Sequence, residues 1–252
     1  MFAISAMAIS ISATLTTSVD KNYVKFDNNL YAARFEVTNK QYREFLGNLK
    51  SENKTAEYIK CMYDSAQWTK KFPSANNKPM VYHSHPAYDN YPVVNISFEA
   101  AKLYCNWLTI QYNRNSKRTY HQVIFRLPTE NEWEKLSAPL PGHNLPWYGN
   151  FPYTDERAKT FLTNIKMKDV IGGNDDYYSD GGIMTIIVGH YKPNNIGIYD
   201  VIGNVCEMTS DGKLKGGSWD NYIDECTVDK SQTYPLPDPR VGFRTIMEVI
   251  EK

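Results

Sequence analysis

Glycine and asparagine residues recur every few positions between residues 171 and 218. The runs IGGNDD, SDGG, NNIG, IGN and KGGS all fall in this stretch. Both residue types favour turns and left-handed backbone, so they interrupt helices and strands. The stretch therefore predicts long loops between short strands, and loops of this length need something to hold them, for which bound metal is one candidate.

Three helix starts are predicted elsewhere in the chain. Thr38 and Gln41 form a capping box, in which the threonine oxygen accepts from a free amide and the glutamine reaches back to the cap. Thr129 and Glu132 repeat this pattern, and Ser97 precedes a run with apolar residues at three- and four-residue steps. The rest of the chain reads as short strands and long loops, so helices are few.

The balance of charge excludes several classes of protein. The chain has 28 basic and 28 acidic residues, and a zero net charge gives no general attraction to nucleic acid or anionic lipid. Apolar residues make up 42% of the 252 residues and the mean hydropathy is −0.53, which is typical of a globular protein rather than a membrane bundle or a disordered chain. The 19 tyrosines suit either an irregular aromatic core or a recognition surface.

Residues 2–15 are small and apolar, and the charged residues Asp20 and Lys21 follow soon after them. This pattern predicts an export signal over residues 1–19, which is too short to cross a bilayer as a helix. No basic residue precedes the apolar run, which points to a truncated start or, alternatively, to an ordinary buried strand or helix. We expect one continuous domain over residues 22–250 in a protein that is exported, periplasmic or at the cell envelope.

Six further segments occur in a characteristic order. Their sequences are FEVTN at residues 35–39, PVVNIS at 92–97, RLPTENEWE at 126–134, YDVIGNVCE at 199–207, GGSW at 216–219 and GFR at 242–244. Together they resemble the formylglycine-generating enzyme family, also called the sulfatase-modifying factor family. The resemblance implies an α+β, compact C-type-lectin-like fold with short antiparallel sheets, few helices and much irregular loop. Residues 68–92 further resemble the gliding-motility lipoproteins of Bacteroidetes, a branch of the family that works at the cell envelope.

Calcium is the metal that suits glycine-rich loops, because it takes about six to eight oxygens from carboxylates, amides and main-chain carbonyls. The resemblance implies two calcium sites. The first would use the side chains of Asn164 and Asp180 with the carbonyls of Ile165 and Gly182, and the second the carboxylates of Asp200 and Glu207 with the carbonyls of Gly203 and Val205. The alternative is that these Asp and Asn residues only cap turns.

The resemblance also implies a copper(I) site, made by two cysteines at the second and seventh positions after the aromatic residue that ends the Gly-Gly-Ser motif. That aromatic residue is Trp219, the second position is Asn221 and the seventh is Cys226. An amide cannot replace a thiolate on copper(I), which is a soft ion, so copper is not expected. Cys226 and Ser218 are the catalytic candidates if activity persists, although Ser218 also fits a simple turn residue.

The other cysteines and histidines predict no further site. Cys105 and Cys206 are expected in the core, Cys61 could form a disulfide in an exported protein, and the pairing of the four cysteines stays open. His83 and His85 have no third ligand at a recognisable spacing, so we interpret them as a loop pair.

Three interpretations of function remain open. The favoured one is a calcium-stabilised scaffold without oxidase activity, whose loops bind a protein, peptide or glycan through Trp219, Asn221, Tyr222 and Tyr234. The second is a formylglycine-generating or related metal oxidase with an altered copper site, which would act on a cysteine of a sulfatase. The third is that these loop residues meet only solvent.

Overall fold

The protein is described by a computed structural model that covers residues 21–72, 81–147, 149–154, 160–168, 175–234 and 236–252. The predicted export signal over residues 1–19 lies outside the described residues. Within them, no helix is long and apolar enough to cross a membrane.

A four-stranded antiparallel sheet joins the two ends of the described chain. Its strands, in spatial order, are β1 (Tyr23–Lys25), β2 (Leu30–Ala33), β10 (Ile246–Glu251) and β3 (Gln122–Arg126). Strand β10 pairs Ile246 with Ala32 on one side and with Arg126 on the other. The C-terminal strand therefore holds together segments that are far apart in the sequence.

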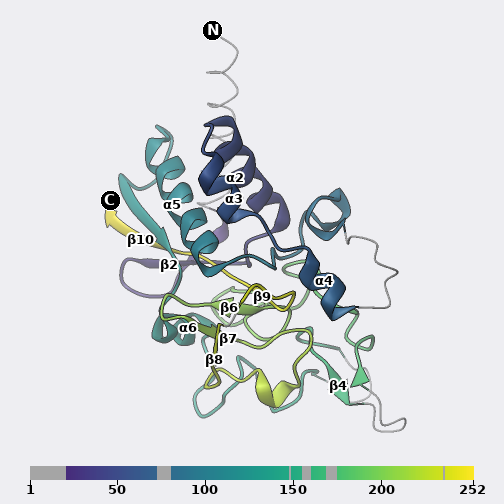
Figure 1. Ribbon diagram of the computed structural model, residues 1–252. Coiled ribbons are helices and arrows are strands. Elements are labelled where there is room, and N and C mark those ends of the chain that lie inside the picture. The colour runs from purple at the N-terminus through teal and green to yellow at the C-terminus, as the bar shows by residue number, and fades with distance from the viewer. Residues whose placement is uncertain (1–20, 73–80, 148, 155–159, 169–174, 235) are drawn as a thin grey trace.

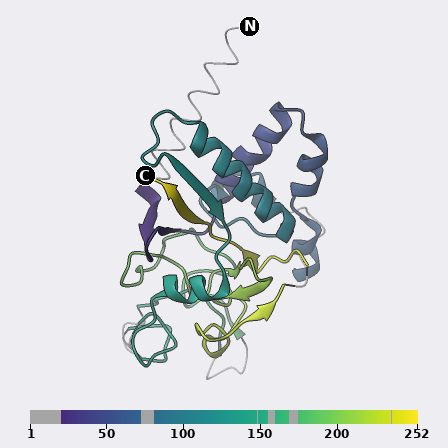
Figure 2. The same ribbon diagram turned by 90° about the vertical axis from the view of Figure 1, so that its left-hand side faces the viewer.

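Helices gather at one end of the molecule, next to this sheet (Figures 1 and 2). They are α2 (Asn39–Ser51), α3 (Thr55–Cys61) and α5 (Phe98–Arg114). The predicted starts are confirmed, because Thr38 and Gln41 form a capping box and the Ser97 hydroxyl accepts from the amide of Ala100 at 3.1 Å. Between α2 and α5 the buried rings of Tyr42 and Tyr104 stack with their centroids 5.9 Å apart. Some of the tyrosines therefore serve an aromatic core, as one interpretation of the composition predicted.

A second sheet supports the glycine-rich end. Its strands, in spatial order, are β8 (Gln232–Thr233), β7 (Lys213–Lys215), β6 (Cys206–Met208) and β9 (Val241–Gly242). Strand β9 runs parallel to β6, whereas the other two pairs are antiparallel. A small two-stranded sheet is made by β4 (Met167–Lys168) and β5 (Asp175–Asp176). The predicted short antiparallel sheets are thus present, with one parallel pair added.

The remaining elements are short. They are α4 (Ala66–Lys71), α6 (Glu130–Ser137) and the 3₁₀ turns η1 (Val81–His83), η2 (Pro86–Tyr88) and η3 (Ile223–Glu225). Helix α6 begins at the predicted capping box of Thr129 and Glu132, and its Trp133 is fully buried. The predicted fold class, an α+β domain with short sheets, few helices and much loop, is confirmed.

The four cysteines are all buried and none is in a disulfide. Cys105 lies on the buried face of α5, and Cys206 packs in the same apolar cluster, as expected for small core residues. Burial raises the pKa of the Cys206 thiol to about 12. Both side chains therefore act as core residues in this structure.

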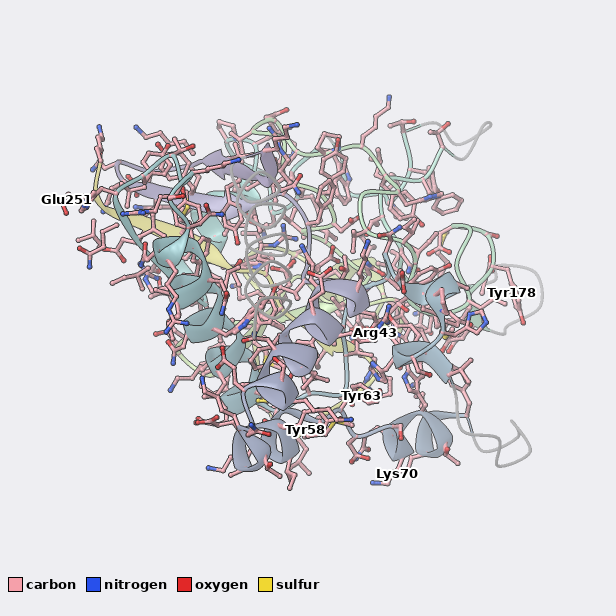
Figure 3. All side chains as sticks on the ribbon, turned by 90° about the horizontal axis from the view of Figure 1, so that it is seen from above. Arg43, Tyr58, Tyr63, Lys70, Tyr178 and Glu251 are labelled. Carbon is pink, nitrogen blue, oxygen red and sulfur yellow. The ribbon has the colours of Figure 1, made fainter. Side chains whose placement is uncertain are left out.

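His83 is buried between aromatic rings, with 2% of its surface exposed. Its ring stacks on Tyr63 with centroids 4.0 Å apart, and its Nδ1 lies 3.2 Å from the Asn39 side-chain oxygen. Arg43, which lies on the same side of the molecule as Tyr63 (Figure 3), donates to the His83 carbonyl. Burial, assisted by the positive charge of Arg43, lowers the pKa of His83 to about 3. His83 is therefore a neutral core residue, whereas the sequence predicted a loop position.

Because the pKa of His83 is lowered in the folded chain, its contribution to the free energy of unfolding depends on pH. The unfolded chain binds a proton at His83 below pH ~6.5 and the folded chain does not, so stability is lost as the pH falls below that value. We expect the difference in unfolding free energy between wild type and His83→Phe to fall by about 2 kcal/mol from pH 7 to pH 5. Urea denaturation at the two pH values measures it, and a difference that does not change with pH would contradict this role for His83.

Candidate functional site: the cysteine loop and the buried carboxylates

Cys226 follows η3 and points into the protein. Its thiol is fully buried, and its sulfur donates to the Tyr222 carbonyl at 3.2 Å. The sulfur packs against Gly217, where a Cβ atom would collide with it. Burial raises the pKa of the Cys226 thiol well above its usual value. Because the thiolate is the form that binds metal and attacks substrates, this thiol is held in its unreactive form.

Asn221 occupies the position where the resemblance implies a second thiol. Its side-chain oxygen accepts from the amide of Ser218 at 3.1 Å and from the Ser218 hydroxyl at 2.7 Å. The Ser218 oxygen in turn accepts from the Asp220 amide at 3.3 Å. The asparagine therefore closes a turn, and Ser218 has the hydrogen bonds of a buried turn residue.

Trp219 was expected to line an open groove, but only 2% of its surface is exposed. Phe72, at the end of α4, stacks on its ring with centroids 5.9 Å apart, and Lys71 places its ammonium 5.5 Å from the ring centre. An ion pair between Lys71 and Asp220 holds this cover in place. Trp219 thus packs beneath α4 and is not available to a ligand in this conformation, which corrects that expectation.

The two tyrosines predicted to line the groove lie in different surroundings. Tyr222 is partly exposed, hydrogen bonds Asp175 through its hydroxyl, and has the ammonium groups of Lys166 and Lys168 at 4.4 and 5.1 Å from its ring centre. Tyr234 packs against the main core and donates to the Ile96 carbonyl at 2.8 Å. Both rings are partly buried, but Tyr222 contacts charged side chains whereas Tyr234 contacts the core.

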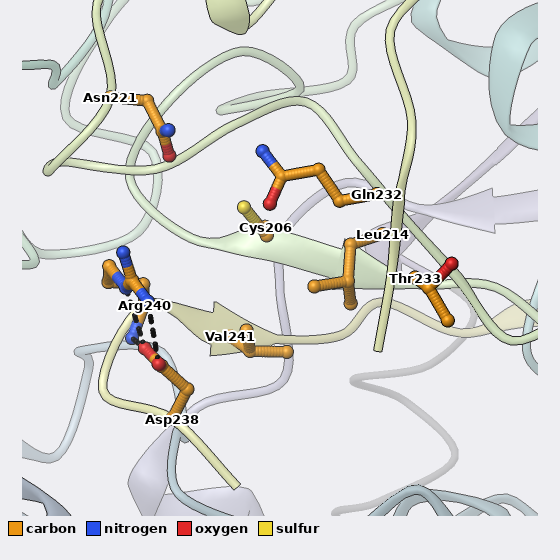
Figure 4. Close-up of a pocket in the computed structure, with 8 residues that line it drawn as sticks. All are labelled: Cys206, Leu214, Asn221, Gln232, Thr233, Asp238, Arg240 and Val241. Atoms are coloured by element: carbon orange, nitrogen blue, oxygen red, sulfur yellow. Dashed lines mark hydrogen bonds and ion pairs between the residues drawn. The ribbon is translucent and has the colours of Figure 1, made fainter. Parts of the chain in front are cut away.

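A small cavity lies beside this loop, between β6, β9 and the turn at Asn221 (Figure 4). Its volume is about 70 Å³, and it is lined by Cys206, Leu214, Asn221, Gln232, Thr233, Asp238, Arg240 and Val241. Sites for small organic ligands usually enclose about 300–1,000 Å³. A cavity this small can hold water molecules, but it is too small for a cofactor or a large side chain of a peptide.

The first predicted calcium set is brought together around Asp180. One carboxylate oxygen of Asp180 accepts from the amide of Ile165 at 2.7 Å, and the other accepts from the amide of Gly182 at 3.0 Å. Asn164 lies next to Gly182 and donates to the Met184 carbonyl at 2.8 Å. Burial raises the pKa of Asp180 to about 6. Asp180 therefore caps the turns at Ile165 and Gly182. Each of its carboxylate oxygens also keeps a lone pair that could bind a cation.

In the second predicted calcium set, Arg244 binds Glu207 but not Asp200. Glu207 is fully buried and accepts from Arg244 Nε at 2.6 Å, from Arg244 Nη2 at 2.5 Å and from the indole of Trp133 at 2.8 Å. Asp200 accepts from the amide of Gly189 at 2.5 Å through one oxygen, and its other oxygen has no hydrogen-bond partner in the described part of the chain. Glu207 therefore pairs with a guanidinium, which the sequence did not indicate.

Gly203 and Val205 connect these two acids. Gly203 has a φ of +75° and its backbone lies against Thr163 and Asn164, so the two predicted calcium sets are neighbours in space. Val205 is buried directly before β6. Across the described residues, no three His, Cys, Asp or Glu side chains converge in a way that could hold a metal ion by themselves. Main-chain carbonyls would have to supply the remaining ligands of either site.

Glu36 is a further buried acid that sequence reasoning did not select. It has 1% of its surface exposed, and one carboxylate oxygen accepts from the Asn204 side chain at 2.9 Å. Its second oxygen has no hydrogen-bond partner among the described residues. Burial, together with the nearby charge of Asp200, raises the pKa of Glu36 well above its usual value. The available signal was an acidic residue between two apolar ones, Phe35 and Val37, within the first family-like segment.

The sequence is similar to proteins named as enzymes and to proteins named as inactive. Residues 12–249 match the sulfatase-modifying factor enzyme 1-like domain. The inactive C-alpha-formylglycine-generating enzyme 2 of Mus musculus is 28% identical over 246 residues, which cover 83% of this chain and 72% of that protein. The Bos taurus protein of the same name is 30% identical over 172 residues, covering 61% of this chain and 49% of its own length. The formylglycine-generating enzyme of Mus musculus is 29% identical over 124 residues, covering 48% of this chain and 27% of the enzyme.

Solved structures share the fold. PvdO from Pseudomonas aeruginosa superposes with a TM-score of 0.57 at 19% identity, covering 87% of this chain and 80% of PvdO. Treponema denticola variable protein 1 superposes with a TM-score of 0.55 at 20% identity, covering 90% of this chain and 91% of that protein. Because the domain match extends over residues 12–249, the chain belongs to the sulfatase-modifying factor family, among whose members are both formylglycine-generating enzymes and proteins named as inactive.

Proposed function

We propose that this protein is a calcium-stabilised member of the family without oxidase activity, exported to the cell envelope, that uses its loops to bind a protein, peptide or glycan. The observation that carries the proposal is Asn221 at the first of the two positions where the resemblance implies copper cysteines, with its side chain hydrogen bonded within the Ser218 turn. The remaining thiol, Cys226, is buried and protonated. A copper(I) ion would find one thiol that resists ionisation and no second thiolate at the expected position.

Calcium is proposed because the glycine-rich loops bring hard oxygen donors together in buried places. Asp180 joins the loop at Ile165 to the loop at Gly182, and Asp200 has a buried oxygen without a partner among the described residues. Carboxylate, amide and carbonyl oxygens are the ligands that calcium prefers. When bound, the ion would supply positive charge to these acids and cross-link loops that contain little regular structure.

Removal of calcium is expected to lower the melting temperature. A ligand present at about 100 times its Kd contributes about 2.7 kcal/mol per site, which corresponds to a shift of about 5–10 °C for a domain of this size. Differential scanning calorimetry with calcium, with EGTA and with calcium restored measures the effect. A melting temperature that EGTA leaves unchanged would contradict the calcium part of the proposal.

Recognition of a peptide or glycan would take place on the surface, since the cavity at Asn221, at about 70 Å³, is smaller than the usual site for an organic ligand. Tyr222 is the candidate contact, because it is partly exposed and its ring lies beside the ammonium groups of Lys166 and Lys168. Probing glycan and peptide arrays with the calcium-loaded protein tests this. We expect Tyr222→Ser to abolish any specific signal and Ile59→Ser, an exposed position on α3, to leave it unchanged. The same signal from both variants would exclude Tyr222 as the contact.

A further inference from the structure

Three aromatic side chains share one face of a short ribbon in the loop between α6 and β4. Residues 152–154 run antiparallel to residues 160–162, and main-chain hydrogen bonds of 2.8 and 3.0 Å join the two segments. Tyr153 pairs directly with Phe161 across the ribbon. Because side chains of an extended chain alternate between its two faces, Phe151 lies on the same face as Tyr153. We call the rings of Phe151, Tyr153 and Phe161 the aromatic face.

The rings of the aromatic face hold one another in place. Phe151 stacks on Tyr153 with centroids 5.6 Å apart and ring planes at 20°, and Phe161 meets Tyr153 edge-on at 6.0 Å. Behind the ribbon, Pro152 is buried, and the indole of Trp147 donates to the Phe151 carbonyl at 2.8 Å. The aromatic face is therefore formed before any ligand arrives, which reduces the entropy lost on binding.

The exposure of this face is unusual for an antiparallel ribbon, whose solvent side normally carries polar residues. Phe151 has 59% of its surface exposed, and Tyr153 and Phe161 are partly exposed. Clustered apolar groups on a surface mark an interaction site. The face is small, however, because one aromatic side chain presents about 150–250 Å², whereas each partner of a standard protein interface buries about 800 Å². Its area fits a small ligand better than a folded protein.

The charge of this segment narrows the chemistry of the ligand. Residues 138–154 and 160–165 contain no Asp, Glu, Lys or Arg, and residues 155–159, which lie outside the described part of the chain, contain two acids and two bases. The exposed polar residues next to the rings in sequence carry amides and hydroxyls, at Asn150, Thr154 and Thr160. An uncharged aromatic surface with such neighbours favours a neutral ligand that is apolar on one face and has hydroxyls at its edge.

We propose that the aromatic face binds a neutral glycan, with one pyranose ring lying flat on the exposed side of Phe151. The C–H groups of a pyranose face carry partial positive charge, which suits the negative face of an aromatic ring. This inference goes beyond the proposed function, because it places a glycan contact on a different loop from Tyr222. A ligand this small binds with a Kd of about 1 mM. Such binding does not survive the washing of an array, so the array experiment reports on Tyr222 alone.

Saturation-transfer difference NMR tests the proposal with four neutral probes: maltohexaose, cellohexaose, mannohexaose and chitohexaose. We expect transfer from wild type to the sugar C–H protons of at least one probe, and the same from Phe151→Trp. Phe151→Ala should raise the Kd at least about 10-fold, the effect of losing one aromatic contact. Tyr178→Ala is the matched control, because Tyr178 is 70% exposed and lies outside the aromatic face (Figure 3). It should bind as wild type does.

The other outcomes each overturn the proposal. Absence of transfer to all four probes excludes a neutral glycan, and equal losses in Phe151→Ala and Tyr178→Ala show non-specific contact with exposed rings. Loss in Tyr222→Ser but not in Phe151→Ala places the glycan at Tyr222, which leaves the proposed function intact. Sedimentation equilibrium covers the remaining case, since a dimer that Phe151→Ala dissociates would show that a second copy of the chain covers this face.

Discussion

Replacing Arg244 with alanine is expected to lower the free energy of unfolding by about 3–5 kcal/mol, the cost of removing one partner of a buried ion pair. The guanidinium is fully buried and donates two hydrogen bonds to Glu207. It also donates to the carbonyls of Ala33 and Tyr199 at 3.1 and 2.8 Å. Its removal leaves the buried Glu207 with only the indole of Trp133 as a hydrogen-bond donor among the described residues and leaves both carbonyls short of a donor.

Urea denaturation measures this loss, and Arg126→Ala is the matched control. Arg126 also pairs with two carboxylates, Glu132 and Glu248, but its side chain is 31% exposed, so solvent can replace those contacts. We expect the control to cost about 1 kcal/mol. Equal losses in the two variants would contradict the claim that burial makes the Arg244–Glu207 pair more costly to break than the exposed pairs of Arg126.

Gly217→Ala is expected to cost about 3 kcal/mol for two separate reasons. Gly217 has a φ of +68°, a left-handed conformation that costs an alanine about 1–2 kcal/mol. A Cβ at this position would also collide with the side chain and the backbone of Cys226, and forcing extra atoms into a packed core costs about 1–3 kcal/mol.

Gly212→Ala separates the two contributions. Gly212 has a φ of +73°, but a Cβ there would meet nothing within 4 Å. This variant should therefore show only the conformational cost, about 1–2 kcal/mol. Urea denaturation of both variants gives the steric contribution as their difference. Identical losses would show that Cys226 does not pack against Gly217.

Local features of the structure could be predicted from the sequence, because they depend on neighbouring residues. The capping boxes at Thr38 and Thr129 and the cap at Ser97 each involve residues three positions apart, and all three are confirmed. The family-like segments indicated the fold class because they cover most of the chain. Several segments that come together around Asp180 were also indicated in this way.

The hydrogen-bond partners of the buried charged residues could not be predicted in the same way. Arg244 contacts Glu207 across 37 positions, and Asn204 contacts Glu36 across 168 positions, so no local pattern records either pair. The cover over Trp219 is of the same kind, because Lys71 reaches Asp220 across 149 positions. A motif shows which residue types are present, whereas the partner of each charge is decided by which segments the fold brings together.

Incubation of the purified protein with copper(I), oxygen and a Cys-x-Pro-x-Arg peptide tests the central claim most directly, with mass spectrometry to detect conversion of the peptide cysteine to an aldehyde. We expect no aldehyde from wild type, because Asn221 supplies no thiolate and the Cys226 thiol is buried. Formation of aldehyde by wild type, and its loss in Cys226→Ala, would contradict the proposal and show that this chain is an oxidase.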